Sequence, residues 1–269
     1  MRRRHVLAVA GVLAGTAATG RLTRPAGDDE LLEAARGPGG GGEATTRTET
    51  ILPDTDHETT LYEIDAPADG PTVMVFGGVH GDERNGIDVA GKVTEWHPDA
   101  GTLVVVPETN RVAVENDSRE GDDGDLNRHF PVDREPASDL ARGVWDAVER
   151  HRPDVVLDLH RSLGIYGVHR QYVGQAIFHS PNADGDAIAN YLDDVGIPWY
   201  MPLHRFTAVT SAMNGPLLFH RAHRELGAIA YLFETTAFLL DRDAMVELTQ
   251  LATAAVLERH GLLEQEGTR

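Results

Sequence analysis

Short apolar runs alternate along the chain with segments in which apolar residues recur at helical spacing. Continuous apolar runs, typical of strands buried on both faces, occupy residues 72–78, 102–108, 154–160 and 227–234. Residues 60–66 alternate between apolar and polar positions, as in a strand buried on one face. Helical spacing is found at residues 85–97, 136–153, 182–196 and 241–261. Strands that alternate with helices predict an α/β fold, with helices on both faces of a sheet.

The N-terminus departs from this pattern. Residues 1–22 contain a basic head, an apolar run too short for a comfortable membrane span, and small residues near its end. This is the layout of an export signal, and Arg3 and Arg4 resemble a twin-arginine motif. We therefore expect a secreted or cell-surface protein, with an uncleaved membrane tether as the alternative.

A polar segment separates this signal from the first regular element. Residues 23–48 include four consecutive glycines, which predicts a flexible linker. The rest of the chain is long enough for one sizeable core. We expect a single catalytic domain over residues 49–262, followed by a short tail over 263–269.

The composition limits the possible partners. The chain has 43 acidic and 24 basic residues, a formal net charge of −19, and Lys92 as its single lysine. An acidic, lysine-poor surface resembles those of halophilic proteins, and an ordinary acidic protein is the alternative. The charge disfavours binding to nucleic acid or to an anionic membrane. Cysteine is absent, so any metal must be held by His, Asp or Glu.

Four side chains with useful chemistry follow the predicted buried strands. His80 and Glu83 come just after the strand at 72–78, and His160 and Glu234 end two others. Ligands bind beyond the carboxyl ends of strands in such sheets. Two histidines and a carboxylate are a typical ligand set for one catalytic Zn²⁺. If Glu234 faces the metal, it is placed to act as a general base.

The segment "DGDLNRHFP" (123–131) adds a decisive pattern. With His-x-x-Glu before it, and Asp-Leu-His and a strand-terminal Glu after it, the chain resembles the succinylglutamate desuccinylase/aspartoacylase family. This family is a branch of the zinc carboxypeptidase superfamily. The resemblance implies a mixed, mostly parallel central sheet with helices on both faces. It also implies zinc on His80, Glu83 and His160, with Glu234 as the base.

The resemblance implies further roles on the substrate side. Asn127 and Arg128 would grip a substrate carboxylate, which suits the forked guanidinium of arginine. Arg119, nine residues after Asn110, would polarise the scissile carbonyl. Asp158, two residues before His160, is a candidate hydrogen-bond acceptor that orients this histidine.

The chain also departs from the family. Arg111 stands where the family usually has proline, and one extra residue separates Arg119 from the Asp-Leu-Asn-Arg element. Only 35 residues follow Glu234, so we expect a minimal form without the C-terminal β-rich domain of the named enzymes. Two alternatives stay open for several side chains between the strands, binding of a second acidic group or pairing with surface carboxylates: Arg161, Tyr166, Arg170, His204 and Arg205.

The sequence thus predicts a zinc-dependent amide hydrolase whose small-molecule or peptide substrate carries a carboxylate. A deacylase of N-acyl amino acids is the first interpretation. A secreted metallocarboxypeptidase is the second. A non-catalytic zinc- or ligand-binding surface protein is the alternative of another class, and the intact Glu234 argues against it because a binder needs no base.

Overall fold

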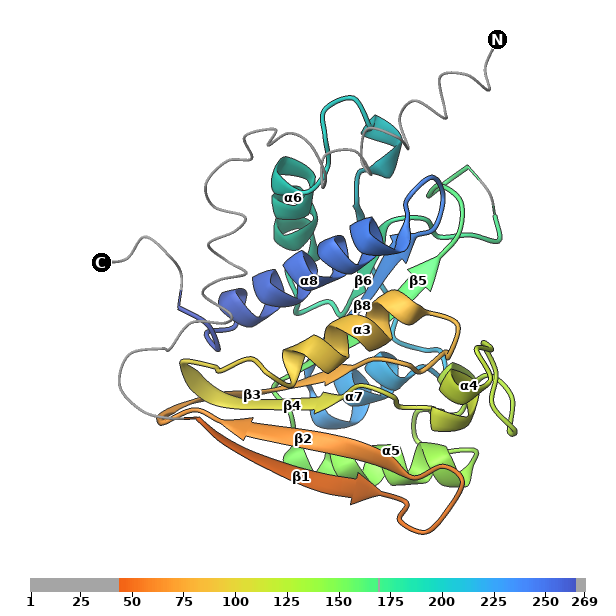
Figure 1. The fold of residues 1–269 in the computed structure, drawn as a ribbon, viewed down its shortest axis with the longest axis vertical. Coiled ribbons are helices and arrows are strands. Elements are labelled where there is room, and N and C mark those ends of the chain that lie inside the picture. The colour runs from red at the N-terminus through yellow and green to blue at the C-terminus, as the bar shows by residue number, and fades with distance from the viewer. Residues whose placement is uncertain (1–43, 169, 265–269) are drawn as a thin grey trace.

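The computed structural model describes residues 44–168 and 170–264. Eight strands in this part of the chain form one sheet in the order β1-β2-β4-β3-β5-β8-β6-β7 (Figure 1). They are β1 (Thr45–Ile51), β2 (Thr59–Asp65), β3 (Ala68–Phe76), β4 (Ala100–Val106), β5 (Val155–Ser162), β6 (Ala176–His179), β7 (Thr207–Thr210) and β8 (Ile229–Thr236). The central strands β4, β3, β5 and β8 run parallel, whereas β1, β2 and β6 pair antiparallel with neighbours. The sheet is therefore mixed and mostly parallel, as predicted.

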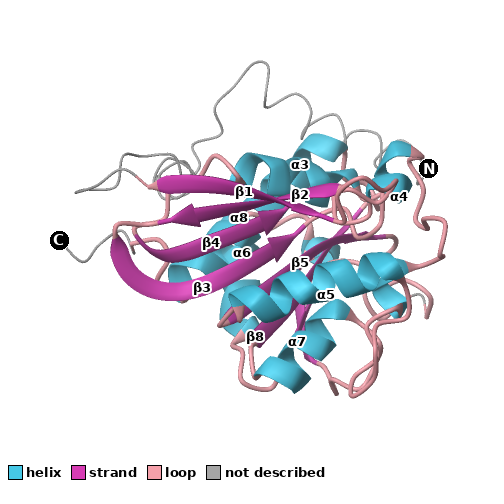
Figure 2. Cartoon of the chain, turned by 90° about the horizontal axis from the view of Figure 1, so that it is seen from below, coloured by secondary structure: helices cyan, strands magenta, loops and turns pink. Residues whose placement is uncertain are grey.

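Helices cover both faces of this sheet (Figure 2). One face carries α3 (Arg84–Val93), α6 (Gly185–Val195) and α8 (Arg242–Arg259). The other face carries α5 (Asp139–His151) and α7 (Leu218–Leu226). The short α4 (Arg111–Glu115) follows β4 at the edge of the sheet. This arrangement confirms the predicted α/β architecture.

The central strands are apolar throughout because each of their faces is buried. In β3, Val73 and Val75 pack against the core under α3 and α8. Met74 and Phe76 point to the opposite face and join the core under α5. Successive side chains of a strand alternate between faces, so both sets must be apolar. The result is a rigid frame whose parallel strands end at one common edge.

Some boundaries differ from the sequence predictions. The helix predicted over 85–97 ends at Val93, and Trp96 turns back into the core instead. β1 begins at Thr45, inside the segment predicted as linker over 23–48, and it pairs along β2. The predicted export signal, most of that linker and the end of the tail lie outside the described residues.

The stretch from 161 to 226 has more regular structure than the sequence pattern indicated. It contains β6, β7, α7 and a turn of 3-10 helix, η2 (Pro202–His204). β6 and β7 extend the sheet beyond β8. Across the two stretches that the structure covers, no helix has both the length and the apolar character required to cross a bilayer.

Candidate metal centre and active site

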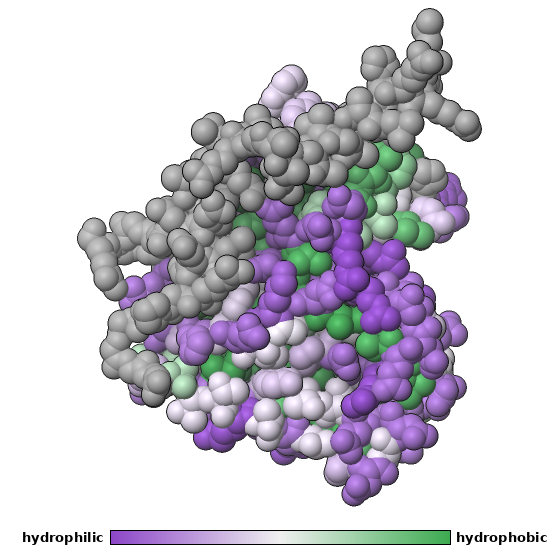
Figure 3. Space-filling model, in the orientation of Figure 1, coloured by the Kyte–Doolittle hydropathy of each residue, from purple (hydrophilic) through white to green (hydrophobic). Residues whose placement is uncertain are grey.

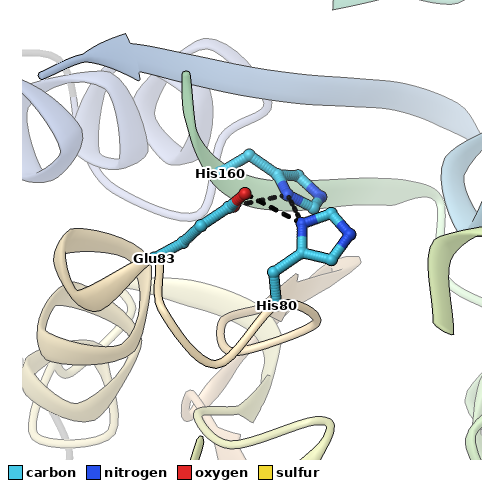
Figure 4. Close-up of side chains that lie close together, drawn as sticks. All are labelled: His80, Glu83 and His160. Atoms are coloured by element: carbon cyan, nitrogen blue, oxygen red, sulfur yellow. Dashed lines mark hydrogen bonds and ion pairs between the residues drawn. The ribbon is translucent and has the colours of Figure 1, made fainter. Parts of the chain in front are cut away.

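The three predicted metal ligands meet at the carboxyl edge of the sheet (Figure 4). His80 and Glu83 lie in the turn between β3 and α3, and His160 lies in the neighbouring strand β5. Nδ1 of His80 is 2.9 Å from Glu83 Oε1, and Nδ1 of His160 is 2.8 Å from Glu83 Oε2. The two Nδ1 atoms are 3.1 Å apart. All three residues are buried.

The turn that carries two of these ligands depends on glycine. Gly78 has φ +65°, a left-handed conformation that other residues rarely adopt. At Gly81, an added Cβ would lie 2.0 Å from the carbonyl carbon and oxygen of Ala113 in α4. The Gly81 N–H donates to Ser118 O at 2.8 Å, so the turn is fixed against the segment that follows α4. The turn therefore has a built-in shape that directs His80 and Glu83 towards β5.

Each histidine is supported by a carboxylate on its other ring nitrogen. Nε2 of His80 is 2.9 Å from Asp125 Oδ1, and Nε2 of His160 is 3.0 Å from Asp158 Oδ2. This pairing is usual for metal-binding histidines, because it fixes the ring orientation and leaves the inner nitrogen free for the metal. The predicted position of Asp158 is confirmed. Asp125 was not predicted, although it begins the Asp-Leu-Asn-Arg element.

The charges of this cluster depend on one another. Burial alone would raise the pKa of Glu83, but the adjacent His160 and His80 hold it well below its usual range. Burial lowers the pKa of His160, and the carboxylates of Asp158 and Glu83 outweigh this effect and raise it well above the ordinary value. The polypeptide thus surrounds its histidines with anionic groups. A divalent cation would satisfy the same charges.

The donor set fits a catalytic zinc ion. His80, Glu83 and His160 each offer one ligand atom, and these atoms lie within 4.8 Å of one another. Two imidazoles and one carboxylate match the three-ligand sets of catalytic zinc sites, which keep a further position for water or substrate. The outer ring nitrogens are already paired with carboxylates, so only the inner nitrogens converge.

Glu234 lies directly beside this cluster. In the β5/β8 ladder it is the register partner of His160, at the end of the adjacent strand. Its Oε2 atom is buried and has no hydrogen-bond partner among the described residues. Burial raises the pKa of Glu234, and the nearby carboxylate of Glu83 raises it further. Such a group is suited to exchange protons near neutral pH.

Asn127 is placed differently from a simple substrate-gripping residue. Its side chain is buried, with Nδ2 3.2 Å from His160 Nε2 and 3.4 Å from Asp158 Oδ2. Its Oδ1 accepts a hydrogen bond of 3.0 Å from the Leu218 N–H at the start of α7. In this structure the amide therefore contacts the His160–Asp158 pair and connects it to α7. A contact between Asn127 and a substrate carboxylate stays a prediction.

The two arginines lie on the accessible side of the cluster. Arg119 donates to Glu83 Oε1 and to Asp125 Oδ2, both at 3.2 Å, and its side chain is 46% exposed. Arg128 donates to the Asn127 carbonyl at 2.8 Å, lies 3.9 Å from Asp125 Oδ2, and is 55% exposed. Both guanidinium groups are thus near the metal ligands and open to a ligand from solvent.

The remaining candidate residues are either hydrogen-bonded within the fold or exposed to solvent. The Arg161 N–H donates to Glu83 Oε2 at 2.9 Å, and its guanidinium donates to Asp82 O and Oδ2 at 3.0 and 3.1 Å. Arg161 therefore holds the ligand turn in place. His204 is buried and bonded through Nε2 to the Phe238 carbonyl at 2.7 Å. Three others are exposed: Tyr166, Arg170 and Arg205.

Comparison with known proteins identifies the family. Residues 69–249 match the "Succinylglutamate desuccinylase/Aspartoacylase catalytic domain". The chain belongs to this family. The matched span includes the main candidate residues of the site: His80, Glu83, Arg119, Arg128, His160 and Glu234.

Individual relatives agree with this assignment. An alignment over 100 residues, which covers 34% of this chain, is 36% identical to the N-alpha-acetyl-L-2,4-diaminobutyric acid deacetylase of Halomonas elongata. The match spans only 29% of that curated relative. A desuccinylase/aspartoacylase structure from Rhodobacter sphaeroides superposes with a TM-score of 0.59, at 19% identity over 83% of this chain and 68% of that one. A putative metallopeptidase from Shewanella denitrificans superposes with a TM-score of 0.63, at 14% identity over 81% and 85%. The two structural likenesses show the shared fold.

Proposed function

We propose that the protein is a zinc-dependent amide hydrolase that removes the acyl group from N-acyl amino acids. One observation carries the proposal: a convergent His80–Glu83–His160 ligand set lies beside Glu234, whose buried Oε2 has no hydrogen-bond partner among the described residues. The family consists of amide hydrolases of this kind, and the Halomonas elongata relative is named as a deacetylase.

His80, Glu83 and His160 would hold the zinc ion, with Asp125 and Asp158 fixing the two imidazoles. When bound, zinc supplies Lewis-acid polarisation of the scissile carbonyl and lowers the pKa of water. The buried ligands and their hydrogen-bonded supports preorganise this site before any substrate arrives.

Glu234 supplies the proton transfers of hydrolysis. Its carboxylate accepts a proton from the water that attacks the amide carbonyl carbon. The same carboxyl then donates this proton to the leaving nitrogen as the carbon–nitrogen bond breaks, so the products are a carboxylate and a free amine. Arg119 stabilises the negative charge that develops on the carbonyl oxygen, because its half-exposed guanidinium already reaches Glu83 in the ligand cluster.

Arg128 would bind the carboxylate of the amino-acid part of the substrate. Its guanidinium is more than half exposed. Two residues of the same segment contact the histidines, since Asp125 contacts His80 and Asn127 contacts His160. A substrate carboxylate there would place the amide next to the ligand cluster. The planar fork of arginine matches a carboxylate through two parallel hydrogen bonds.

A substrate panel tests this function. Purified full-length protein with zinc would be assayed in high salt against N-acetyl, N-succinyl and N-formyl amino acids and against short peptides. We expect amine release from acyl amino acids, its loss on chelation and its return with zinc. Preferential release of C-terminal residues from peptides would favour the metallocarboxypeptidase, which the fold shared with the Shewanella denitrificans protein also allows. If the protein binds zinc but hydrolyses none of the compounds in the panel, the non-catalytic alternative is favoured.

We also propose that the enzyme works outside the cytoplasm, in a salty environment. The support is the paired Arg3 and Arg4 before a short apolar run, and the net charge of −19. Replacing both arginines with lysine should keep the protein inside the cell, as measured by fractionation of the producing cells. Unchanged export of this double variant would contradict a twin-arginine route.

A further inference from the structure

Exposed apolar side chains are concentrated in one place. Among the described residues, the large hydrophobic side chains that are exposed all belong to three loops. We call them the apolar rim: Leu163, Tyr166 and Val168 after β5, Trp199, Tyr200 and Leu203 before β7, and Phe238 and Leu239 after β8. Figure 3 shows hydrophobic surface at the upper right, where Figure 1 places the loops around η2 and after β5 and β8. Gathered exposed apolar groups usually mark a binding surface.

Hydrogen bonds join the three loops into one surface. The Ala237 N–H donates to Ser162 O at 3.0 Å, and the Thr236 hydroxyl donates to Gly164 O at 2.6 Å. His204 connects η2 to the third loop through the Phe238 carbonyl, and its ring stacks on Phe238 at 6.2 Å between centroids. The rim is therefore a fixed part of the fold, built on strands β5 and β8.

The rim begins where the catalytic strands end. Leu163 follows His160 by three residues, and Phe238 follows Glu234 by four. An extended chain of this length reaches about 10 to 14 Å, so the rim starts within that distance of the ligand cluster. Arg119 and Arg128 lie elsewhere, on the segments that follow α4. In the view of Figure 1, α4 lies below the start of α3, and the loops after β5 and β8 lie above it.

This layout identifies the part of the substrate that would cover the rim. In an N-acyl amino acid, the carboxylate and the acyl chain extend in opposite directions from the amide. If the arginine side binds the carboxylate, the acyl chain points away from it, towards the loops after β5 and β8. An acyl chain that lies over these loops would cover apolar side chains that are exposed in the free protein.

We propose that the apolar rim is the acyl subsite, and that the preferred substrates are amino acids carrying a long aliphatic acyl chain. This inference rests on the proposed function, because it assumes that the scissile amide lies at the ligand cluster. It goes beyond that function by naming the acyl group. Burial of each methylene group against the rim adds binding energy in proportion to the apolar area removed from water.

Binding can be tested without turnover. Trp199 is 87% exposed, whereas Trp96 and Trp145 are 3% and 2% exposed, so a ligand on the rim would change mainly the emission of Trp199. Metal-free, full-length protein would be titrated with N-decanoylglycine and with N-acetylglycine. We expect a saturable blue shift with the decanoyl compound alone, and its loss in Trp199→Phe. No shift with the decanoyl compound would overturn the inference.

The chain-length dependence of catalysis provides a second test. For the zinc enzyme, kcat/KM should rise on the order of 100-fold from acetyl to decanoyl substrates, roughly twofold per methylene when one side of the chain is covered. The double variant Leu163→Ser, Phe238→Ser should reduce this ratio at least about tenfold. Leu52→Ser changes a half-buried leucine in the β1–β2 turn, with β4 and β3 between it and β5; it is the control and should keep the ratio.

The outcomes separate this inference from the proposed function. Hydrolysis of acetyl substrates with a flat chain-length profile would overturn the acyl subsite and leave the amide hydrolase standing. A decanoyl-specific blue shift in a protein that hydrolyses nothing would support the apolar site and contradict the function. An equal shift with phosphatidylcholine vesicles, without any chain-length effect on kcat/KM, would overturn the subsite in favour of a lipid-docking surface.

Discussion

The ligand group (His80, Glu83 and His160) and the arginine side (Arg119 and Arg128) are adjacent, yet they are organised in different ways. Every member of the ligand group is buried and held by side chains on more than one element. The two arginines are about half exposed and bind mainly to carboxylates and carbonyls nearby. The candidate metal site is thus held in place by the polypeptide alone, whereas the two arginines keep exposed surface that a ligand could cover.

Asp125 links the two regions and explains how they differ. Its Oδ1 is bonded to His80 Nε2, and its Oδ2 receives a hydrogen bond from Arg119 with Arg128 close by. These neighbours hold the pKa of Asp125 well below its usual range despite burial. The arginines are therefore kept near the cluster by an anionic residue of the protein. A substrate carboxylate would compete for the same positive charge.

Replacing one of the predicted metal-ligating residues should have the largest effect on activity. His160→Ala should lose bound zinc and reduce activity below detection, while circular dichroism shows the fold retained, because β5 is held by neighbours on both sides. Elemental analysis measures the zinc. His97→Ala, an exposed histidine, is the matched control and should keep about one zinc per chain. Full zinc content in His160→Ala would show that the ligand group is wrongly assigned.

The second-largest effect on activity is expected for Glu234→Gln. The substitution preserves shape but removes the base, so kcat should fall by about 10²- to 10⁴-fold with zinc still bound. Steady-state kinetics and zinc analysis on the same preparation separate the two effects. A variant that turns over as fast as the parent protein would show that another group moves the proton.

The supporting carboxylates should have an intermediate effect. Asp158→Asn should weaken zinc affinity by about 10- to 100-fold, because an amide orients His160 less firmly than a carboxylate does. Competition with a chelator measures this affinity. Asp125→Asn should weaken zinc similarly, and it should also lower KM because it frees Arg119 and Arg128. Asp117→Asn, on the surface beside Arg84, is the control. Identical kinetics for the two supporting variants would contradict the link through Asp125.

The sequence alone was sufficient to predict the ligand group, because the apolar runs show where the buried strands end. His80 and His160 follow apolar runs whose carboxyl ends must meet at one edge of a parallel sheet, and the structure confirms this. Asn127 lies in a single turn of 3-10 helix, η1 (Leu126–Arg128), with Asp125 as its N-cap, and so short an element has no readable periodicity. Their partners, His80 and the start of α7, are fixed only by tertiary packing. The pattern AIFH of β6 is too short to distinguish a strand from a loop, and β1 is almost entirely polar.

The smallest expected effect concerns Arg128. A hydrogen bond to a charged group is worth about 1.5 to 3 kcal/mol, which corresponds to roughly 10- to 100-fold in kcat/KM. Because the guanidinium is 55% exposed, Arg128→Ala should fall near the lower end of this range. Arg111→Ala, an exposed arginine paired with Glu115, is the control and should leave kcat/KM unchanged.

A double cycle of enzyme and substrate decides whether this loss reflects carboxylate binding. Replacing the substrate carboxylate with an uncharged amide should cost the parent enzyme about as much as Arg128→Ala does, and combining both changes should add little. High salt screens charges beyond about 3 Å at 1 M, so the effect should survive there if the contact is direct. Additive losses would mean that Arg128 acts on the fold around Asp125 and that another exposed cation, such as Arg119, receives the carboxylate.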